Sequence, residues 1–181
     1  MSVLQKIETV VAGWLKSVPH LPKGGQKWLA ENVWWIVLIG VIGSAIGILV
    51  TIGSIFAYLA FLGNATSYYG VYVASPYGGG WIIATLVSLA FSVALLIVSA
   101  MAISPLKAQH KKGWSLLFLS FVVSLVYTVA RAVLTLNPLT FIFELIFGAI
   151  GVAIFAYFLF EIRSHFVGTG AKTVSAKPVK K

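Results

Sequence analysis

The sequence contains no cysteine and no aspartate, and only 9% of its 181 residues are charged. Without cysteine, the chain forms no disulfide and offers no thiolate for catalysis or for a Cys-based metal site. The carboxylates are Glu8, Glu31, Glu144 and Glu161, and no two of them have the spacing of a catalytic pair. We therefore predict no catalytic residue and expect the chain not to be an enzyme.

Histidine is also scarce and lies outside the long apolar runs of the sequence. His20, His110 and His165 show no metal-ligand spacing, and none is placed to hold a haem between membrane helices. A Gly-rich phosphate loop followed by Lys and Ser or Thr is absent as well. The sequence therefore predicts no metal site and no cofactor.

Apolar residues make up 60% of the chain, and its mean hydropathy is +1.00. A soluble domain carries about 25% charged residues, so lipid is the expected solvent here. Runs of about 20 apolar residues are long enough to cross a bilayer. They occupy residues 33–62, 81–103, 114–136 and 139–160. We predict an all-α polytopic membrane protein, a four-transmembrane-helix bundle whose overlong first span tilts or projects from the bilayer.

Lysine and arginine are distributed asymmetrically around these runs. They occur in residues 1–30, between the second and third runs, and in the tail. Residues 62–80 and the turn at 137–138 carry none. Positively charged loops stay cytoplasmic, so both termini are predicted to be cytoplasmic. The net charge of +9 is therefore interpreted as attraction to anionic lipids at the cytoplasmic face, and no nucleic-acid partner is expected.

Residues 1–30 are predicted to form a cytoplasmic arm with an amphipathic helix. Its apolar positions recur at helical spacing and are Leu4, Ile7, Val10, Val11, Trp14, Leu15 and Val18. Such a helix lies in the membrane interface or docks on the bundle or a partner protein. Pro19, Pro22 and Gly24–Gly25 are expected to break it before the 31–166 membrane domain, and 167–181 is expected to be a disordered basic tail.

Two charged residues, Arg131 and Glu144, fall inside the predicted spans. Each is equally distant from the turn at Asn137 and Pro138, so an antiparallel hairpin places them at the same depth. Because an isolated charge in hydrocarbon is costly, we predict that the two side chains form an ion pair. The pair is interpreted first as a clip between two spans. An unpaired Arg131 that reaches the interface, and a substrate or proton pathway, are the alternatives.

Each span also carries a face of small or polar residues. Membrane helices pack through small residues and interhelical hydrogen bonds, so these faces are expected to meet. A hydrated cavity or pore between them is the alternative. The predicted packing face consists of Gly40, Gly43, Gly47, Gly148 and Gly151. The predicted polar stripes consist of Thr85, Ser88, Ser92, Ser120, Ser124 and Thr128.

Three motifs resemble an uncharacterised family of small bacterial membrane proteins with four predicted transmembrane helices. They are LPKG leading into KW at 21–28, KKGW leading into LLF at 111–118, and FLFEIR at 158–163. The resemblance implies a location in the bacterial cytoplasmic membrane and implies no activity. Span ends carry Trp and basic residues in any case, as interfacial anchors.

Two functions are compatible with this pattern. The leading hypothesis is a non-enzymatic accessory, scaffold or assembly subunit of a membrane complex, associating with other membrane subunits or with further copies of itself. The alternative is a small oligomeric transporter or channel whose Ser/Thr stripes line a path. Both hypotheses place the chain in the lipid bilayer.

Overall fold

The computed structural model describes residues 3–69, 78–134 and 138–167, and the predicted tail from residue 168 onwards lies outside this range. The described residues form six helices joined by short connections. These are α1 (Val3–Leu15), α2 (Lys23–Tyr69), α3 (Gly78–Lys107), α4 (Lys111–Leu134), α5 (Pro138–Glu161) and α6 (Arg163–Val167).

In the described part of the chain, four helices are long and apolar enough to cross a membrane. Their membrane-length segments are Lys23–Phe61, Ile82–Lys107, Lys111–Leu134 and Phe141–Glu161. The predicted all-α, multi-pass fold with a short N-terminal helix is thereby confirmed. By helix length and composition, the protein is an integral membrane protein in contact with lipid.

Helix α2 begins at Lys23, well before its apolar run. It includes the pair Gly24–Gly25, which was expected to lie in the break between the N-terminal amphipathic helix and the first span. The break instead covers residues 16–22, which contain Pro19 and Pro22. Glycine costs a helix only about 1 kcal/mol per residue, whereas proline stops it more strongly. With 47 residues, α2 is about 70 Å long at the helical rise, more than twice the thickness of a hydrocarbon core.

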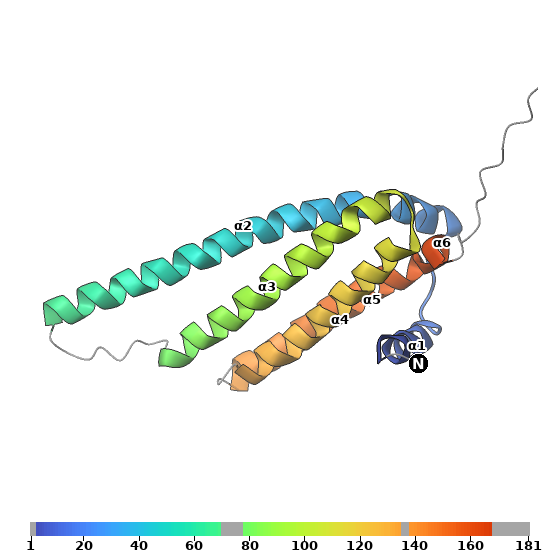
Figure 1. Ribbon diagram of the computed structural model, residues 1–181. Coiled ribbons are helices and arrows are strands. Elements are labelled where there is room, and N and C mark those ends of the chain that lie inside the picture. Colours follow the sequence, from blue (N-terminus) through green and yellow to red (C-terminus); the bar gives the residue numbers. More distant parts are fainter. Residues whose placement is uncertain (1–2, 70–77, 135–137, 168–181) are drawn as a thin grey trace, which may run out of the picture.

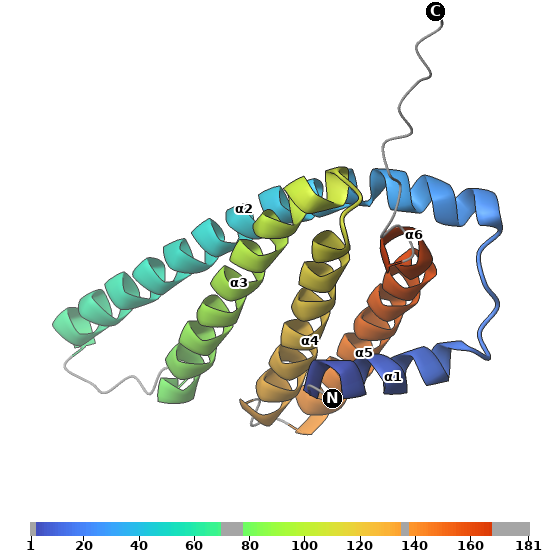
Figure 2. The same ribbon diagram turned by 45° about the vertical axis from the view of Figure 1, so that its right-hand side comes forward.

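The membrane-length helices form an open row in the order α2, α3, α4, α5 (Figures 1 and 2). Extensive contacts join consecutive helices of the row, and α2 and α5 share no such contact among the described residues. We call the end of the row that includes α6 the basic end, and the opposite end the open end. At the open end α2 diverges from α3 (Figure 1), so the expected bundle is not closed there.

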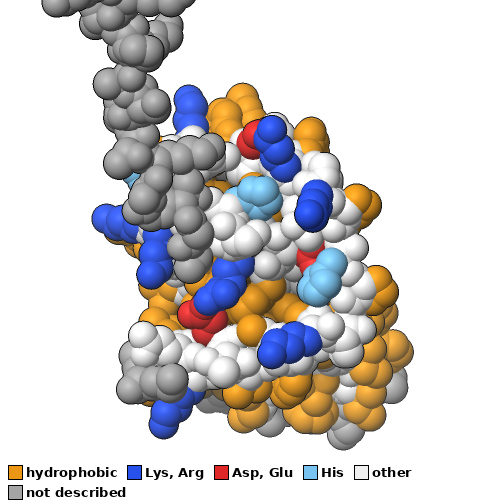
Figure 3. Space-filling view, turned by 90° about the vertical axis from the view of Figure 1, so that its right-hand side faces the viewer, with side chains coloured by type: hydrophobic (Ala, Val, Ile, Leu, Met, Phe, Trp, Pro, Cys, Tyr) orange, Lys and Arg blue, Asp and Glu red, His pale blue; other side chains and the backbone are white. Residues whose placement is uncertain are grey.

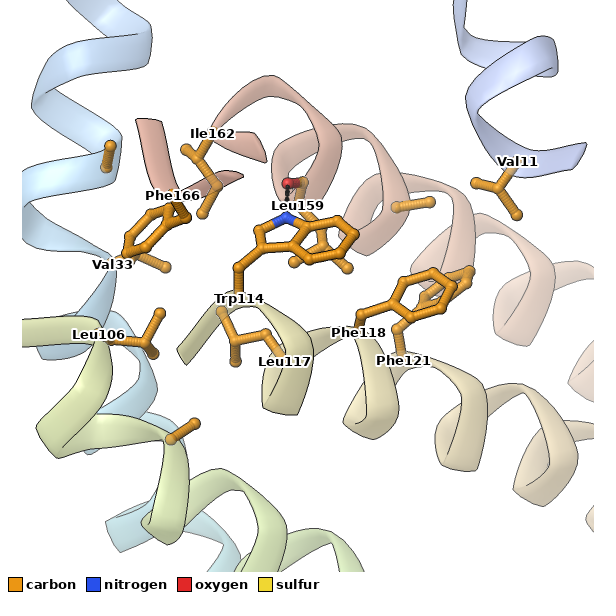
Figure 4. Packing of buried hydrophobic residues seen from close by; sticks show 13 residues of the cluster. Val11, Val33, Leu106, Trp114, Leu117, Phe118, Phe121, Leu159, Ile162 and Phe166 are labelled. Atoms are coloured by element: carbon orange, nitrogen blue, oxygen red, sulfur yellow. Dashed lines mark hydrogen bonds between the residues drawn. The ribbon is translucent and has the colours of Figure 1, made fainter. Parts of the chain in front are cut away.

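The hydrophobic core lies at the basic end and draws on all six helices. Trp114 is at its centre, and its indole Nε1 donates a hydrogen bond to the carbonyl of Leu159 at 2.9 Å (Figure 4). The start of α2 crosses this end, where Val33 lies beside Phe166 of α6. The first and last helices of the row are thus joined at the basic end alone.

A tight turn connects α3 to α4 at the basic end. Gln109 adopts a left-handed conformation with φ of 52°, and the amide of His110 bonds to the carbonyl of Pro105 at 2.8 Å. This is a Schellman-type helix ending with glutamine in the position usually taken by glycine. Gly113 then permits a close approach, since a Cβ there would lie 2.7 Å from the backbone nitrogen of Leu106.

Helix α1 contacts the bundle through only part of its apolar face. Val11 is buried against the core, and Ile7 and Leu15 are partly buried. Glu8 accepts hydrogen bonds from Arg163 Nη2 at 2.6 Å and Nε at 2.9 Å. Trp14 stays 74% exposed. Both sequence interpretations therefore keep support: one edge of α1 docks on the bundle, and the adjoining edge leaves apolar surface available to lipid.

Candidate functional site

A polar groove of about 360 Å³ lies between the four long helices, toward the open end of the row. Each of the four helices contributes side chains to its wall. The polar side chains that line it are Thr51 and Ser54 from α2, Thr85 and Ser88 from α3, Tyr127 and Arg131 from α4, and Glu144 from α5.

Arg131 and Glu144 meet across the α4–α5 contact. Arg131 Nε donates to Glu144 Oε1 at 3.0 Å, and Arg131 Nη1 donates to the hydroxyl of Tyr127 at 3.4 Å. Equal distance from the turn places both residues at one depth, as in the hairpin argument from sequence. The Arg131 side chain is 55% exposed and that of Glu144 21%, so the pair borders the groove without being enclosed by protein.

Three of the six hydroxyl groups of the predicted polar stripes bond to carbonyls of their own helix. Ser92 donates to the carbonyl of Ser88 at 2.8 Å, and Thr128 donates to that of Ser124 at 2.9 Å. Ser124 donates to the carbonyl of Phe121 at 2.8 Å. Such bonds to the preceding turn satisfy a hydroxyl without a neighbouring helix. Of the stripe residues, Thr85 and Ser88 line the groove together with Arg131 and Glu144. Ser92 and Ser124 do not line it.

Ser120 is the stripe residue that reaches a neighbouring span. It is buried at the α3–α4 contact, with its hydroxyl oxygen 3.4 Å from that of Ser99. The contact lies nearer to the core than the groove does, on the side of Phe121 and Trp114. This part of the stripe packs helices together, as one of the two sequence interpretations proposed.

The predicted glycine face is divided by the structure. At Gly148 an added Cβ would lie 2.5 Å from Thr128 Cγ2, so this glycine permits close packing of α4 and α5. A Cβ added at Gly40, Gly43, Gly47 or Gly151 would meet no described atom within 4 Å. These four glycines therefore make no close contact among the described residues, and their role in helix packing stays a prediction. The Gly40–Gly47 face of α2 is exposed in the single chain and leads, along the same side of the helix, to Thr51 and Ser54 of the groove.

Glu161 is a structural centre that the sequence analysis did not identify. Glu161 is the last residue of α5, and its side chain is only 3% exposed. It accepts three hydrogen bonds from residues that lie just before α2 or in its first turn. The donors are the Leu21 amide at 2.9 Å and Gln26 Nε2 at 2.9 Å, with His20 Nδ1 at 2.6 Å. Tyr157 adds a bond from its hydroxyl to the Pro19 carbonyl at 2.9 Å. The connection between α1 and α2 is thus fastened to the end of α5.

Lys, Arg and His side chains gather on the face at the basic end of the row, together with a few acidic groups (Figure 3). Two of these cations also contact aromatic rings of the helix ends. Lys107 Nζ lies 4.9 Å from the centroid of Trp34, and the Arg163 guanidinium lies 5.6 Å from that of Trp114. Cations stacked on indoles at helix ends are typical of the boundary between lipid and water.

Within the described ranges, no three His, Asp or Glu side chains come together as a metal site. No protein-family model matches the chain, and no curated protein or solved structure is significantly similar to it. The resemblance of residues 21–28, 111–118 and 158–163 to a four-span bacterial family stays a prediction. Residues 111–118 and 158–163 do include Trp114, Leu159 and Glu161, which hold the basic end together.

Proposed function

We propose that the protein is a non-enzymatic subunit of a larger membrane assembly, with an accessory, scaffold or assembly role. In this proposal it lies in the bacterial cytoplasmic membrane with both termini in the cytoplasm. The orientation rests on the lysines of the basic end, because positively charged connections stay on the cytoplasmic side. A second helix from another subunit, or from a second copy, covers the polar groove.

The half-exposed Arg131–Glu144 pair carries this proposal. A charged side chain within a span costs about 2.5–3.5 kcal/mol at the bilayer centre on insertion scales. Pairing offsets part of that cost, yet 55% of the Arg131 side chain still faces the surroundings of a single chain. A covering helix would remove this surface from lipid, and its own polar groups would find hydroxyl and guanidinium partners in the groove.

The edge position of α2 supports the same proposal. The face of α2 that carries Gly40, Gly43 and Gly47 also exposes apolar side chains such as Ile36 and Val50. Small residues at this spacing let a second backbone approach closely in lipid. The face and the groove border the same helix, so one neighbouring helix can contact both.

A photo-crosslinking residue placed at Leu134, which lines the groove, tests the proposal in intact membranes. We expect an adduct of one defined mass that contains a second copy or a single membrane protein. The same crosslinker at Ile154, an exposed position of α5 that does not line the groove, is the matched control and should label only lipid.

A further variant makes the result specific to the ion pair. In Arg131→Met with Glu144→Leu, apolar side chains replace both charges, a change that is often neutral for folding. We expect this variant to insert normally and to lose most of the adduct. Equal labelling from Leu134 and Ile154, or a chain that stays monomeric with no adduct, would refute the association.

A small oligomeric transporter or channel is the second candidate function. It is favoured by the groove itself, since hydroxyls of α2 and α3 face a charged pair on α4 and α5. Four spans are few for a transporter, so several copies would have to enclose the path. Purified protein in liposomes should then conduct ions or take up solutes, and Arg131→Met with Glu144→Leu should abolish the flux. Silent liposomes at every oligomeric state would exclude this function.

A further inference from the structure

A second groove, entirely separate from the polar one, lies between α1 and the α4–α5 pair. It has a volume of about 460 Å³ and is lined almost wholly by apolar side chains. In Figure 2, α1 runs crosswise to α4 and α5, so its apolar edge overhangs these helices. Small residues of α5, namely Ala149, Ala153 and Ala156, shape the floor beneath Trp14 and Leu15 of α1.

The chemistry of the lining restricts what can occupy this groove. Thr128 is its only hydroxyl-bearing residue, and that hydroxyl already donates to the carbonyl of Ser124 at 2.9 Å. An occupant therefore gains little from hydrogen bonding here and must be apolar along its length. The volume lies in the range of about 300–1,000 Å³ that is usual for ligand pockets. A lipid acyl chain has this chemistry and surrounds the helices already.

A neighbouring pocket that shares one residue with the groove contains a cation that forms no ion pair among the described residues. Leu15 lines both this groove and a neighbouring pocket of about 210 Å³ that contains Lys16, His20 and Arg163. Arg163 is paired with Glu8, and His20 contacts Glu161. Lys16 forms no ion pair with any residue in the described ranges. Its ammonium group is therefore the cation there that remains to neutralise an anion.

We propose that the α1–α4–α5 groove binds one anionic phospholipid, with an acyl chain against Ala149 and Ala153 and the phosphate at Lys16. The lipid completes the contact of α1 with the bundle, which protein side chains make through Val11, Ile7 and Leu15 and through the Glu8–Arg163 pair. This site shares no lining residue with the polar groove, so it does not depend on the proposed assembly function.

Trp14 provides a direct readout, because its exposed ring lines the groove. The full chain in detergent is titrated with phosphatidylglycerol or phosphatidylcholine bearing brominated acyl chains, which quench nearby tryptophan. Subtracting the signal of Trp14→Phe isolates the contribution of this residue. We expect Trp14 to be quenched at a lipid concentration at least fivefold lower for phosphatidylglycerol than for phosphatidylcholine.

Two substitutions separate the site from bulk lipid. Ala149→Leu with Ala153→Leu fills the groove at exposed positions, and Ala57→Leu makes the same change on the exposed face of α2 as control. Native mass spectrometry should detect one retained phosphatidylglycerol in the unaltered chain and in Ala57→Leu. The filled variant should lose it, and Lys16→Gln should remove the preference for the anionic headgroup.

The opposite results would overturn the proposal. Equal lipid retention by the filled variant and the unaltered chain would mean that annular lipid alone is present. Equal quenching by the two lipids, unchanged in Lys16→Gln, would show that no anionic headgroup is selected.

Discussion

The basic end and the open end of the helix row differ in how far their polar side chains are buried and hydrogen-bonded within one chain. At the basic end, six helices converge on one apolar core, and the buried carboxylate of Glu161 receives three hydrogen bonds. At the open end, the helices separate around a groove bordered by the half-exposed Arg131–Glu144 pair. The basic end satisfies its buried carboxylate within one chain, whereas the open end leaves much of the Arg131 side chain uncovered.

The comparison predicts that core substitutions matter far more at the basic end. Phe121 is buried and packs edge-on against Phe155, with ring centroids 5.9 Å apart, whereas Phe56 of α2 is 67% exposed. Phe121→Ala should lower the free energy of unfolding by about 3 kcal/mol, the lower part of the usual range because lipid remains apolar. Phe56→Ala should change it little. Thermal unfolding in detergent measures both, and similar losses would contradict the contrast.

The next effect concerns the charges of the open end. Glu144→Leu alone leaves Arg131 without its carboxylate within a span and should cost about 2–3 kcal/mol. Exchanging the residues, Arg131→Glu with Glu144→Arg, should restore most of the loss because the pair is kept at the same depth. The fraction of inserted, folded protein in membranes is the measurement. Failure of the exchange to recover folding would argue against a stabilising pair.

Glu161 provides the corresponding test at the basic end. Glu161→Leu leaves the Leu21 amide without its acceptor and removes one of the two acceptors of Gln26 Nε2, and should cost about 2 kcal/mol. Trypsin should then cleave faster at Lys16 and Lys23, which flank the released connection. Glu31→Leu is the control, since its pair with Lys27 at 3.9 Å is exposed and worth under about 0.5 kcal/mol. Unchanged cleavage in Glu161→Leu would show that this carboxylate does not hold the connection.

The smallest effects should come from two glycines and should differ in sign. Gly113→Ala places a Cβ against the backbone of Leu106 and should cost about 1 kcal/mol after the gain in chain entropy. Gly47→Ala has open space around it and should stabilise α2 by up to about 1 kcal/mol through helix propensity. Thermal unfolding checks both; a destabilised Gly47→Ala would mean that another helix already covers this face.

The sequence predicted the structure best at features that depend on a single physical requirement. Apolar run length predicted the four membrane-length helices, and equal distance from a turn brought Arg131 and Glu144 to the same depth. Helix ends were less predictable, because Lys111 and Lys112 continue α4 beyond its apolar run. Gly24–Gly25 also remain helical, since Pro22 and the bonds to Glu161 determine where α2 begins.

The arrangement of the helices could not be predicted in the same way. In a membrane, surfaces that face lipid and surfaces that face another helix are equally apolar, so periodicity does not distinguish them. Gly40, Gly43 and Gly47 were therefore assigned to the interior, although α2 is an edge helix. Glu161 was missed for another reason: its donors lie 135 to 141 residues earlier, beyond the reach of any local pattern.

That separation between Glu161 and its donors has a consequence for biogenesis. The carboxylate follows the last membrane-length helix, while His20, Leu21 and Gln26 precede or begin the first. During synthesis these donors emerge long before their acceptor exists, so the contact cannot form until the final span has been threaded into the bilayer. Formation of these hydrogen bonds therefore marks the completion of insertion. In a chain truncated before the end of α5, the connection between α1 and α2 would lack its acceptor.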